Sequence, residues 1–269
     1  PQIFFSGEET GAEGRAFAHV ATGALEGQSF ELPALGKMSF ENVLVRPFPG
    51  FRTVVAATDD TTPGQVYFYL GTKRWSGNLI DRLGLTGGAL YGVRVPGVAL
   101  EDRATGIGAA TRFELANLGD VSAKTGAQLQ SDSVAASVTE FLRPEDGVWD
   151  PCDPRVFYFV TTDRFQSSTQ DGRSRLWMLR FDSAFAPQNG GTITALLDGT
   201  EGQQMFDNLT IDRNGNLLIQ EDPGNQDHLA RIWQYTPSSD ALKLIAEHSA
   251  VYFGAGSPSL LTRDEESSG

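Results

Sequence analysis

Cysteine and histidine are scarce in this sequence. Cys152 is the single cysteine, so no disulfide can form within the chain, and its place between two prolines predicts a structural role in a turn. The three histidines, His19, His228 and His248, are not paired at the spacing of metal ligands. We therefore expect each histidine to be a surface or sheet residue, and no zinc or copper site.

Positive charge, long apolar runs and several catalytic motifs are also missing. Lys and Arg number 21 against 34 Asp and Glu, a net charge of −13, so the surface repels nucleic acid and anionic membranes. No apolar run is long enough to span a bilayer. No nucleophile elbow, phosphate-cradling glycine loop or CxxC pair is found. The excess of carboxylates is explained either by solubility or by cation binding.

What the chain does contain is typical of a folded all-β protein. Hydrophobic residues make up 40% of it, and 30 glycines with 13 prolines suit short strands joined by tight turns. The clearest unit runs from 206 to 235. In it Asp207 heads a strand, Asn214-Gly215 makes a turn, Glu221 ends the next strand, and a closing strand carries aromatic residues.

This unit recurs along the chain. Related segments lie in residues 3–20, 39–70 and 143–182, at intervals of roughly fifty residues, which is close to the size of propeller repeats. The pattern predicts one domain over residues 1–269, a β-propeller of four-stranded antiparallel blades. We count about five blades, one of them in the irregular stretch 71–120. Because a propeller must close, we expect the chain to be incomplete at one or both ends.

One short helix is expected among the strands. Residues 133–142 have a helix-like pattern, and Asp132 before them is a plausible N-terminal cap.

Carboxylates occupy matching places in the repeated segments. One set stands at the start of a strand: Glu41, Glu145 and Asp207. The other set follows the next strand: Glu8, Glu9, Asp59, Asp60, Asp163, Glu221 and Asp222. A single Asp after a strand is usually a turn former, whereas Glu is a poor one. Carboxylates gathered on a propeller axis would repel one another unless cations neutralised them. Oxygen-only ligands favour Ca²⁺, because Mg²⁺ prefers to keep its waters.

Five short segments, taken in order, resemble the PhoX-type bacterial alkaline phosphatases over nearly the whole chain. They are GEE at 7–9, GKMSFENVLV at 36–45, TDD at 58–60, RPEDGVWDP at 143–151 and FDNLTIDRNGNLLIQED at 206–222. The resemblance implies an exported six-bladed propeller, secreted or periplasmic, that hydrolyses small phosphorylated substrates. It also implies a cluster of calcium and iron ions on the propeller axis.

The resemblance assigns roles to particular residues. It implies that the metal ligands are Glu8, Glu9, Glu41, Glu145, Asp207 and Glu221, to which we add Asp60 of the TDD segment. It also implies that Arg143, in the RPE match, lies near the phosphate. Several calcium ions would bind the phosphoryl oxygens, and the arginine would complete the clamp.

Two departures from the family pattern bear on function. Gly7 stands where the family has an iron-binding cysteine, and Phe40-Glu41 replaces a His-Glu pair. These changes argue against a family-like diiron centre, whereas we expect the hard-cation sites to be retained. Four alternatives stay open: a calcium-only phosphatase, an enzyme of shifted chemistry, a non-catalytic calcium-stabilised binding or surface module, and a hydrolase similar to calcium-dependent lactonase propellers.

Overall fold

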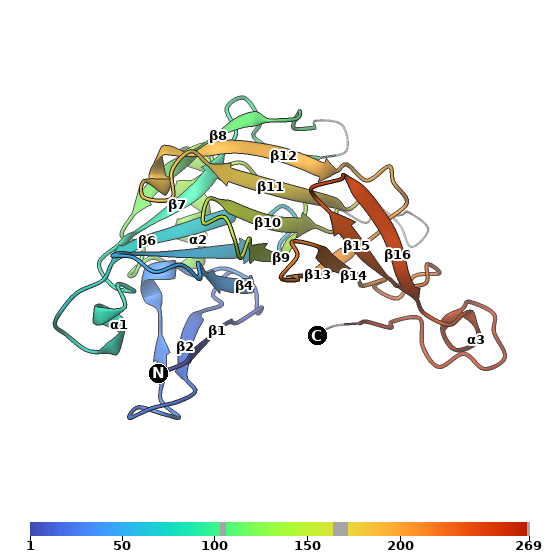
Figure 1. Ribbon diagram of the computed structural model, residues 1–269, viewed down its shortest axis with the longest axis horizontal. Helices are drawn as coiled ribbons and strands as arrows, with labels where there is room; N and C mark the ends of the chain where they lie inside the picture. The colour runs from blue at the N-terminus through green and yellow to red at the C-terminus, as the bar shows by residue number, and fades with distance from the viewer. Residues whose placement is uncertain (103–105, 164–171, 268–269) are drawn as a thin grey trace.

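Antiparallel strands make up most of the regular structure in a computed structural model that describes residues 1–102, 106–163 and 172–267. Figure 1 shows the strands as an arch with β1 and β2 at one end and β13 to β16 at the other. The strands are β1 Ile3–Gly7, β2 Ala16–Val20, β3 Ser29–Glu31, β4 Phe40–Val45, β5 Arg52–Asp59, β6 Val66–Thr72, β7 Ala89–Arg94, β8 Thr111–Gly119, β9 Pro144–Trp149, β10 Val156–Thr161, β11 Arg175–Phe181, β12 Gly191–Leu197, β13 Phe206–Ile211, β14 Leu217–Glu221, β15 Arg231–Thr236 and β16 Ala241–Glu247. The prediction of an all-β fold is confirmed.

Helices are few and short in the described residues. They are the α-helices α1 Leu79–Arg82, α2 Gly126–Ala135 and α3 Ala250–Phe253, and the 3-10 helices η1 Pro33–Leu35 and η2 Pro187–Asn189. None of these helices is both long and apolar enough to cross a membrane.

The strands form three sheets within the described residues. Strands β1 to β3 make a three-stranded sheet, and β13 to β16 make a four-stranded one. The largest sheet has nine strands in the order β4-β5-β6-β7-β8-β12-β11-β10-β9. It consists of two four-stranded units, β4 to β7 and β9 to β12, which β8 joins by pairing with β7 and β12. This arrangement is propeller-like.

The expected number of about five blades is not confirmed. The described residues contain three four-stranded units and one three-stranded sheet. The irregular stretch 71–120 does not form a further blade, because β7 completes the first four-stranded unit and β8 continues the sheet toward β12. We define the first strands of the units, β1, β4, β9 and β13, as the inner strands. Consecutive inner strands lie side by side.

The helix expected at residues 133–142 is misplaced. The helix α2 runs from Gly126 to Ala135, and its cap is Thr125, which forms a capping box with Gln128. Asp132 lies inside α2 and pairs with Lys124 at 2.7 Å. The Thr-x-x-Gln spacing is a helix-start signature that outweighs the cap at Asp132.

The core lies between consecutive sheets. Strand β10 shows why, since its side chains alternate between two buried faces. Phe157 and Phe159 belong to the cluster shared with the β4 to β7 unit, where aromatic rings meet edge to face. Tyr158 and Val160 belong to the cluster shared with β13 to β15. A strand buried on both faces has the near-continuous apolar sequence seen here.

One buried carboxylate ties three inner strands together. Asp146 of β9 accepts hydrogen bonds from the Asn42 side chain of β4 at 2.5 Å and from the Leu209 amide of β13 at 2.9 Å. It also accepts the Gly147 amide at 2.6 Å. Asp146 is 8% exposed, so these donors have little access to water as a substitute. The relative position of the three inner strands depends on this side chain.

We expect Asp146→Ala to destabilise the protein by about 2–4 kcal/mol, because three donors lose a buried charged acceptor. The measurement is urea unfolding followed by circular dichroism. The matched control is Asp182→Asn, at an ion pair with Arg112 that is about half exposed, which should change stability by less than about 0.5 kcal/mol. Equal effects of the two variants would contradict the role given to Asp146.

Candidate metal centre

Three carboxylates from three different units converge where the inner strands meet. Glu41 of β4, Glu145 of β9 and Asp207 of β13 each offer an oxygen atom, and these atoms lie within 4.8 Å of one another. Glu145 is buried, and Glu41 and Asp207 are half-buried. We call these three residues the central cluster. They are the set of carboxylates that the sequence places at strand heads.

A break in strand pairing occurs at each of the three positions. Glu41 has no partner between the pairs Phe40↔Asp59 and Asn42↔Thr58. In β9, Glu145 and Asp146 together lie opposite one residue of β10. Asp207 and Asn208 of β13 likewise lie opposite one residue of β14. Such bulges bend a strand and redirect a side chain, so they account for side chains that leave the sheets and meet.

Burial and like charge act on the cluster together. Burial, followed by the charge of Asp207, raises the pKa of Glu41 to about 8. Burial, followed by the charges of Asp222 and Glu266, raises the pKa of Asp207 to about 7. Burial also raises the pKa of Glu145 well above its usual value. In a metal-free protein at neutral pH, part of this cluster therefore holds protons.

Arg143 supplies the positive charge at the edge of the cluster. Its Nε and one terminal nitrogen donate to both oxygens of Asp60 at 3.0 and 3.1 Å. The same terminal nitrogen lies 2.8 Å from Glu145 Oε1. Burial opposes its charge, but Glu145 and Asp60 outweigh burial and hold the pKa of Arg143 above its usual value. Arg143 is the residue expected near a phosphate, and 29% of its side chain is exposed.

Backbone strain accompanies this arginine. Arg143 has a φ of 58°, in the left-handed region that non-glycine residues seldom adopt. It immediately precedes β9, and its carbonyl accepts the Thr162 amide at 3.1 Å. Strained residues of this kind tend to occur at functional sites.

Glu9 and Asp60, two further predicted ligands, lie at the rim. A hydrogen bond to Asp60 and the charge of Asp60 add to burial in raising the pKa of Glu9. Asp60 is also the residue that holds Arg143. The two carboxylates are therefore neighbours of each other and of the arginine, outside the three-oxygen cluster itself.

Glu8 and Glu221, also predicted as ligands, are occupied by other partners. Glu8 makes a two-point ion pair with Arg15, whose hydrogen bonds lower the pKa of Glu8. The oxygens of the fully buried Glu221 accept the Trp233 indole, the Gln204 and Arg231 amides, and contact His228 at 2.7 Å. Four protein partners satisfy Glu221, so the chain uses this carboxylate to organise β14 and β15.

The remaining carboxylates of the predicted sets also bind the chain. Asp59 accepts the Ser39 amide, Asp163 accepts the Arg173 amide, and Asp222 accepts the Gly224 amide. The sequence interpretation missed Glu266, whose charge raises the pKa of Asp207 and Glu9. Glu266 lies outside any strand or repeat, so no local pattern signals its place beside the cluster.

The donor set fits a hard divalent cation. The cluster offers carboxylate oxygens, and Glu145 Oε2 is buried without a hydrogen-bond partner. Its other oxygen, Oε1, is satisfied by Thr162 at 2.7 Å and by Arg143. A buried oxygen without a donor is costly unless a cation binds it.

Thiolate-bound iron does not fit this chain. Gly7 stands where a cysteine would be required, and a Cβ atom at Gly7 would clash with the Cβ of Phe40. Phe40 itself replaces a histidine of the resembled family and is fully buried. The closest atom is the Cβ of residue 40, which every residue except glycine carries, so the close approach of the two backbones leaves no space for a side chain at residue 7.

The fold and the cluster define a class: a propeller-like antiparallel β protein with carboxylates from neighbouring inner strands gathered at one point. The model of the family described as alkaline phosphatase PhoX matches residues 23–266. The chain belongs to the PhoX alkaline phosphatase family.

A solved structure supports the fold. The chain is similar to Pseudomonas fluorescens PhoX in complex with vanadate, a transition state analogue, with a TM-score of 0.61 and 15% sequence identity. The match covers 86% of this chain and 48% of that one, so the chain spans about half the length of the solved protein. Among curated proteins, no match to this chain is found.

We expect calcium to stabilise the protein more as pH rises. Glu41 and Asp207 have pKa values of about 8 and 7 in the folded protein, above their usual values, so the metal-free protein loses stability as pH rises from about 5 to 8. Bound calcium would remove that loss. Thermal unfolding with calcium or with a chelator should show a difference in Tm that grows over this range. A Tm difference of the same size at about pH 5 and about pH 8 would contradict the expectation.

The variants Glu145→Gln and Glu221→Gln should separate metal binding from structure. Glu145→Gln removes the negative charge of the carboxylate whose Oε2 has no hydrogen-bond partner, and it should lower calcium affinity by about tenfold or more, as measured by calorimetry. Glu221→Gln should retain calcium affinity but lose stability by about 2–4 kcal/mol, because its buried donors lose a charged acceptor. Loss of calcium binding in Glu221→Gln alone would reverse the two assignments.

Proposed function

We propose that the protein is a calcium-dependent phosphomonoesterase of the PhoX type. The observation that carries this proposal is the central cluster of Glu41, Glu145 and Asp207 with a partly exposed arginine at its edge, in a chain of the PhoX family. Anionic ligands and a positive donor beside them suit phosphate esters, which need both charge neutralisation and hydrogen bonds.

The central cluster would hold the cation, with Glu9 as a further oxygen donor at its rim, whereas both oxygens of Asp60 pair with Arg143. A cation bound there would neutralise the carboxylates and withdraw electrons from the phosphoryl oxygens of a substrate. Ionised Glu41 and Asp207 are the forms that bind a cation, so the same residues release their protons on loading.

Arg143 is the proposed phosphate-binding group. Its contacts with Asp60 and Glu145 use Nε and one terminal nitrogen, so among the described residues the other terminal nitrogen has no hydrogen-bond partner. That nitrogen carries two donors, which suit a phosphate oxygen. Asp60 fixes the plane of the guanidinium by its two-point contact, so the free donors are held in one direction.

The proposed reaction is hydrolysis of a small phosphorylated substrate. The oxygen of a water molecule bonds to phosphorus, the bond from phosphorus to the ester oxygen breaks, and the alcohol leaves with one proton of the water. The donors of Arg143 would stabilise the charge that develops on the equatorial oxygens. The vanadate complex of the similar solved protein supports phosphoryl transfer as the reaction class. Export from the cytoplasm, to the periplasm or the medium, is part of the same proposal.

Calcium, without iron, is the cofactor that we propose. The clash between a Cβ at Gly7 and Phe40 leaves no space for a thiolate ligand, whereas the carboxylates of the cluster require none. Several calcium ions are compatible with the four carboxylates of the cluster and Glu9.

The proposal is tested by turnover of p-nitrophenyl phosphate with added calcium, with and without iron, and by a parallel assay of lactone hydrolysis. We expect phosphatase turnover that calcium supports and iron does not increase. Absence of phosphatase turnover in every condition would overturn the proposal. Chelator-sensitive heat stability without any turnover would then favour a non-catalytic module, and lactone hydrolysis would favour the lactonase-like alternative.

Arg143→Gln should lower kcat/KM for p-nitrophenyl phosphate by about a hundredfold, because the transition state loses a charged donor. Calcium content, measured by atomic emission, should not fall, since Arg143 is not a ligand. The matched control is Arg155→Gln, which removes a surface arginine that pairs with Asp153 and should leave turnover unchanged. Equal turnover in Arg143→Gln and the parent protein would remove the arginine from the mechanism.

A further inference from the structure

A second candidate binding site lies beside α1. It is a pocket of about 550 Å³ that shares no lining residue with the central cluster. Its lining comes from the N-terminal strand β1, the turn before β5 and the segment from the end of β6 through α1: Pro1, Ile3, Gly50, Phe51, Lys73, Arg74, Trp75, Leu79, Arg82 and Leu83. A pocket of this volume suits a small organic molecule.

The charge of this pocket is opposite to that of the protein. Lys73, Arg74 and Arg82 line it, and an adjoining smaller cavity adds Arg46 and Arg52. Neither lining contains an acidic residue, although the chain has a net charge of −13. A local concentration of cations on an acidic protein attracts anions to that place.

Two of the cations are free to bind a ligand. Within the described part of the chain, neither Lys73 nor Arg82 makes an ion pair, and both residues are exposed. Arg46 is less available, because it donates to the Ala184 carbonyl at 2.9 Å and lies over the Trp149 ring. The helix α1 carries one carboxylate, that of Asp81, and it accepts hydrogen bonds from the Asn78 amide and the Thr86 hydroxyl.

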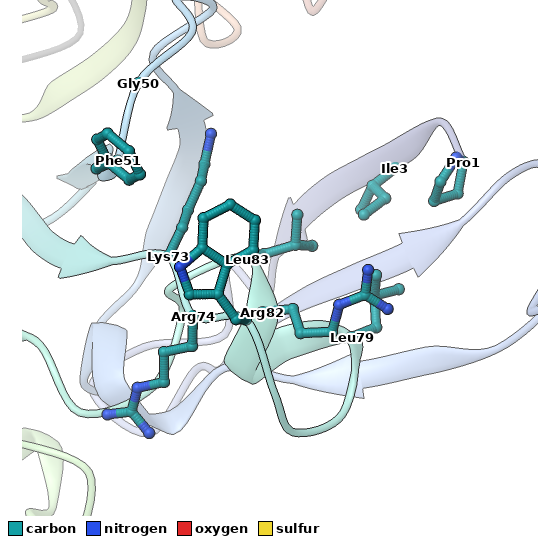
Figure 2. Close-up of a pocket in the computed structure, with 10 residues that line it drawn as sticks. Pro1, Ile3, Gly50, Phe51, Lys73, Arg74, Leu79, Arg82 and Leu83 are labelled. Atoms are coloured by element: carbon teal, nitrogen blue, oxygen red, sulfur yellow. The ribbon is translucent and has the colours of Figure 1, made fainter.

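Large apolar side chains stand beside these cations. Trp75 is 93% exposed and Phe51 is 73% exposed, whereas Trp149, Trp177 and Trp233 are all buried. Figure 2 shows Phe51 and Lys73 on one side of the pocket and Ile3 and Leu79 on the other, with Leu83 and Arg82 between them. Exposed aromatic rings next to cations are typical of binding surfaces.

Hydrogen bonds connect the elements that line the pocket. The helix α1 begins with a capping box between Asn78 and Asp81. The Thr53 hydroxyl donates to the Leu83 carbonyl, and the Lys73 amide donates to the Phe51 carbonyl at 2.8 Å. These bonds join β5, the end of β6 and the α1 segment, so the pocket exists before any ligand arrives.

We propose that this pocket binds a small organic anion with a flat apolar body, such as an aryl sulfonate, sulfate or phosphate. The apolar body would lie against Trp75 and Phe51, and the anionic group would be held by Lys73 and Arg82. The charge complementarity and the exposed aromatic rings carry this assignment. It is independent of the proposed phosphatase activity, because no residue of the central cluster takes part.

The test compares two probes that share one ring system, naphthalene-1-sulfonate and the uncharged naphthalene-1-sulfonamide. Calorimetry gives their affinities. Nitrogen-15 NMR of the four tryptophan indoles, with the signal of Trp75 assigned from Trp75→Phe, locates the probe. We expect the sulfonate to shift the Trp75 signal and leave the three buried indoles unchanged. The sulfonamide should bind at least about fivefold more weakly, and added salt should weaken only the sulfonate.

A pair of double variants completes the test. Lys73→Gln/Arg82→Gln should weaken sulfonate binding by about tenfold. Lys243→Gln/Arg213→Gln, which removes two exposed cations from the β13 to β16 unit, should leave it unchanged. Circular dichroism confirms that each variant is folded.

Four results would overturn the proposal. The first is equal affinity for the charged and uncharged probes, which would leave an apolar pocket without anion recognition. The second is equal loss of affinity in the two double variants, and the third is no shift of the Trp75 indole signal. The fourth is a concentration-dependent dimer that Trp75→Ala dissociates, which would assign the pocket to a second copy of the chain.

Discussion

Repulsion among carboxylates at the meeting point of the inner strands is the constraint that the rest of the structure has to offset. Three oxygen atoms from Glu41, Glu145 and Asp207 lie within 4.8 Å in partly buried surroundings. Such an arrangement persists only where the backbone holds it or a cation or proton neutralises it. The chain supplies the first condition itself, because Asp146 joins three inner strands and bulges direct the carboxylates inward. Without a metal, burial and the repulsion between the carboxylates raise the pKa values of the cluster.

The parts that could be predicted from the sequence are those set by local patterns. The alternation of apolar and polar residues, together with turn residues, predicted most strands. The acidic residue repeated at the start of a strand identified the members of the central cluster. The bulges could not be predicted, because pairing register depends on the neighbouring strand. The separate role of Glu221 could not be predicted either. Its place at the end of a strand matches the repeat, but four partners within residues 204–233 satisfy its oxygens. The expected number of about five blades is not confirmed, because in the described residues β8 joins two of the units in one sheet.

The pair Gly7 and Phe40 shows how one steric relationship can decide between two kinds of metal chemistry. The residues lie on neighbouring strands, β1 and β4, and the phenylalanine occupies the space beside the glycine. Any side chain at residue 7 would therefore require the two strands to move apart. The carboxylates of β4, β9 and β13 already lie close together and require no such movement.

Arg143 connects the electrostatics of the cluster with its proposed use. In the metal-free protein its guanidinium is the counter-charge for Glu145, at 2.8 Å, and for Asp60. In the proposed function, a divalent cation within reach of Glu145 would supply that counter-charge more strongly, so the attraction between Arg143 and Glu145 would weaken when the cation binds. Asp60 would still hold the guanidinium by two hydrogen bonds and keep its plane fixed. The same arginine would then stabilise the metal-free cluster and offer donors to an anion when a cation is bound.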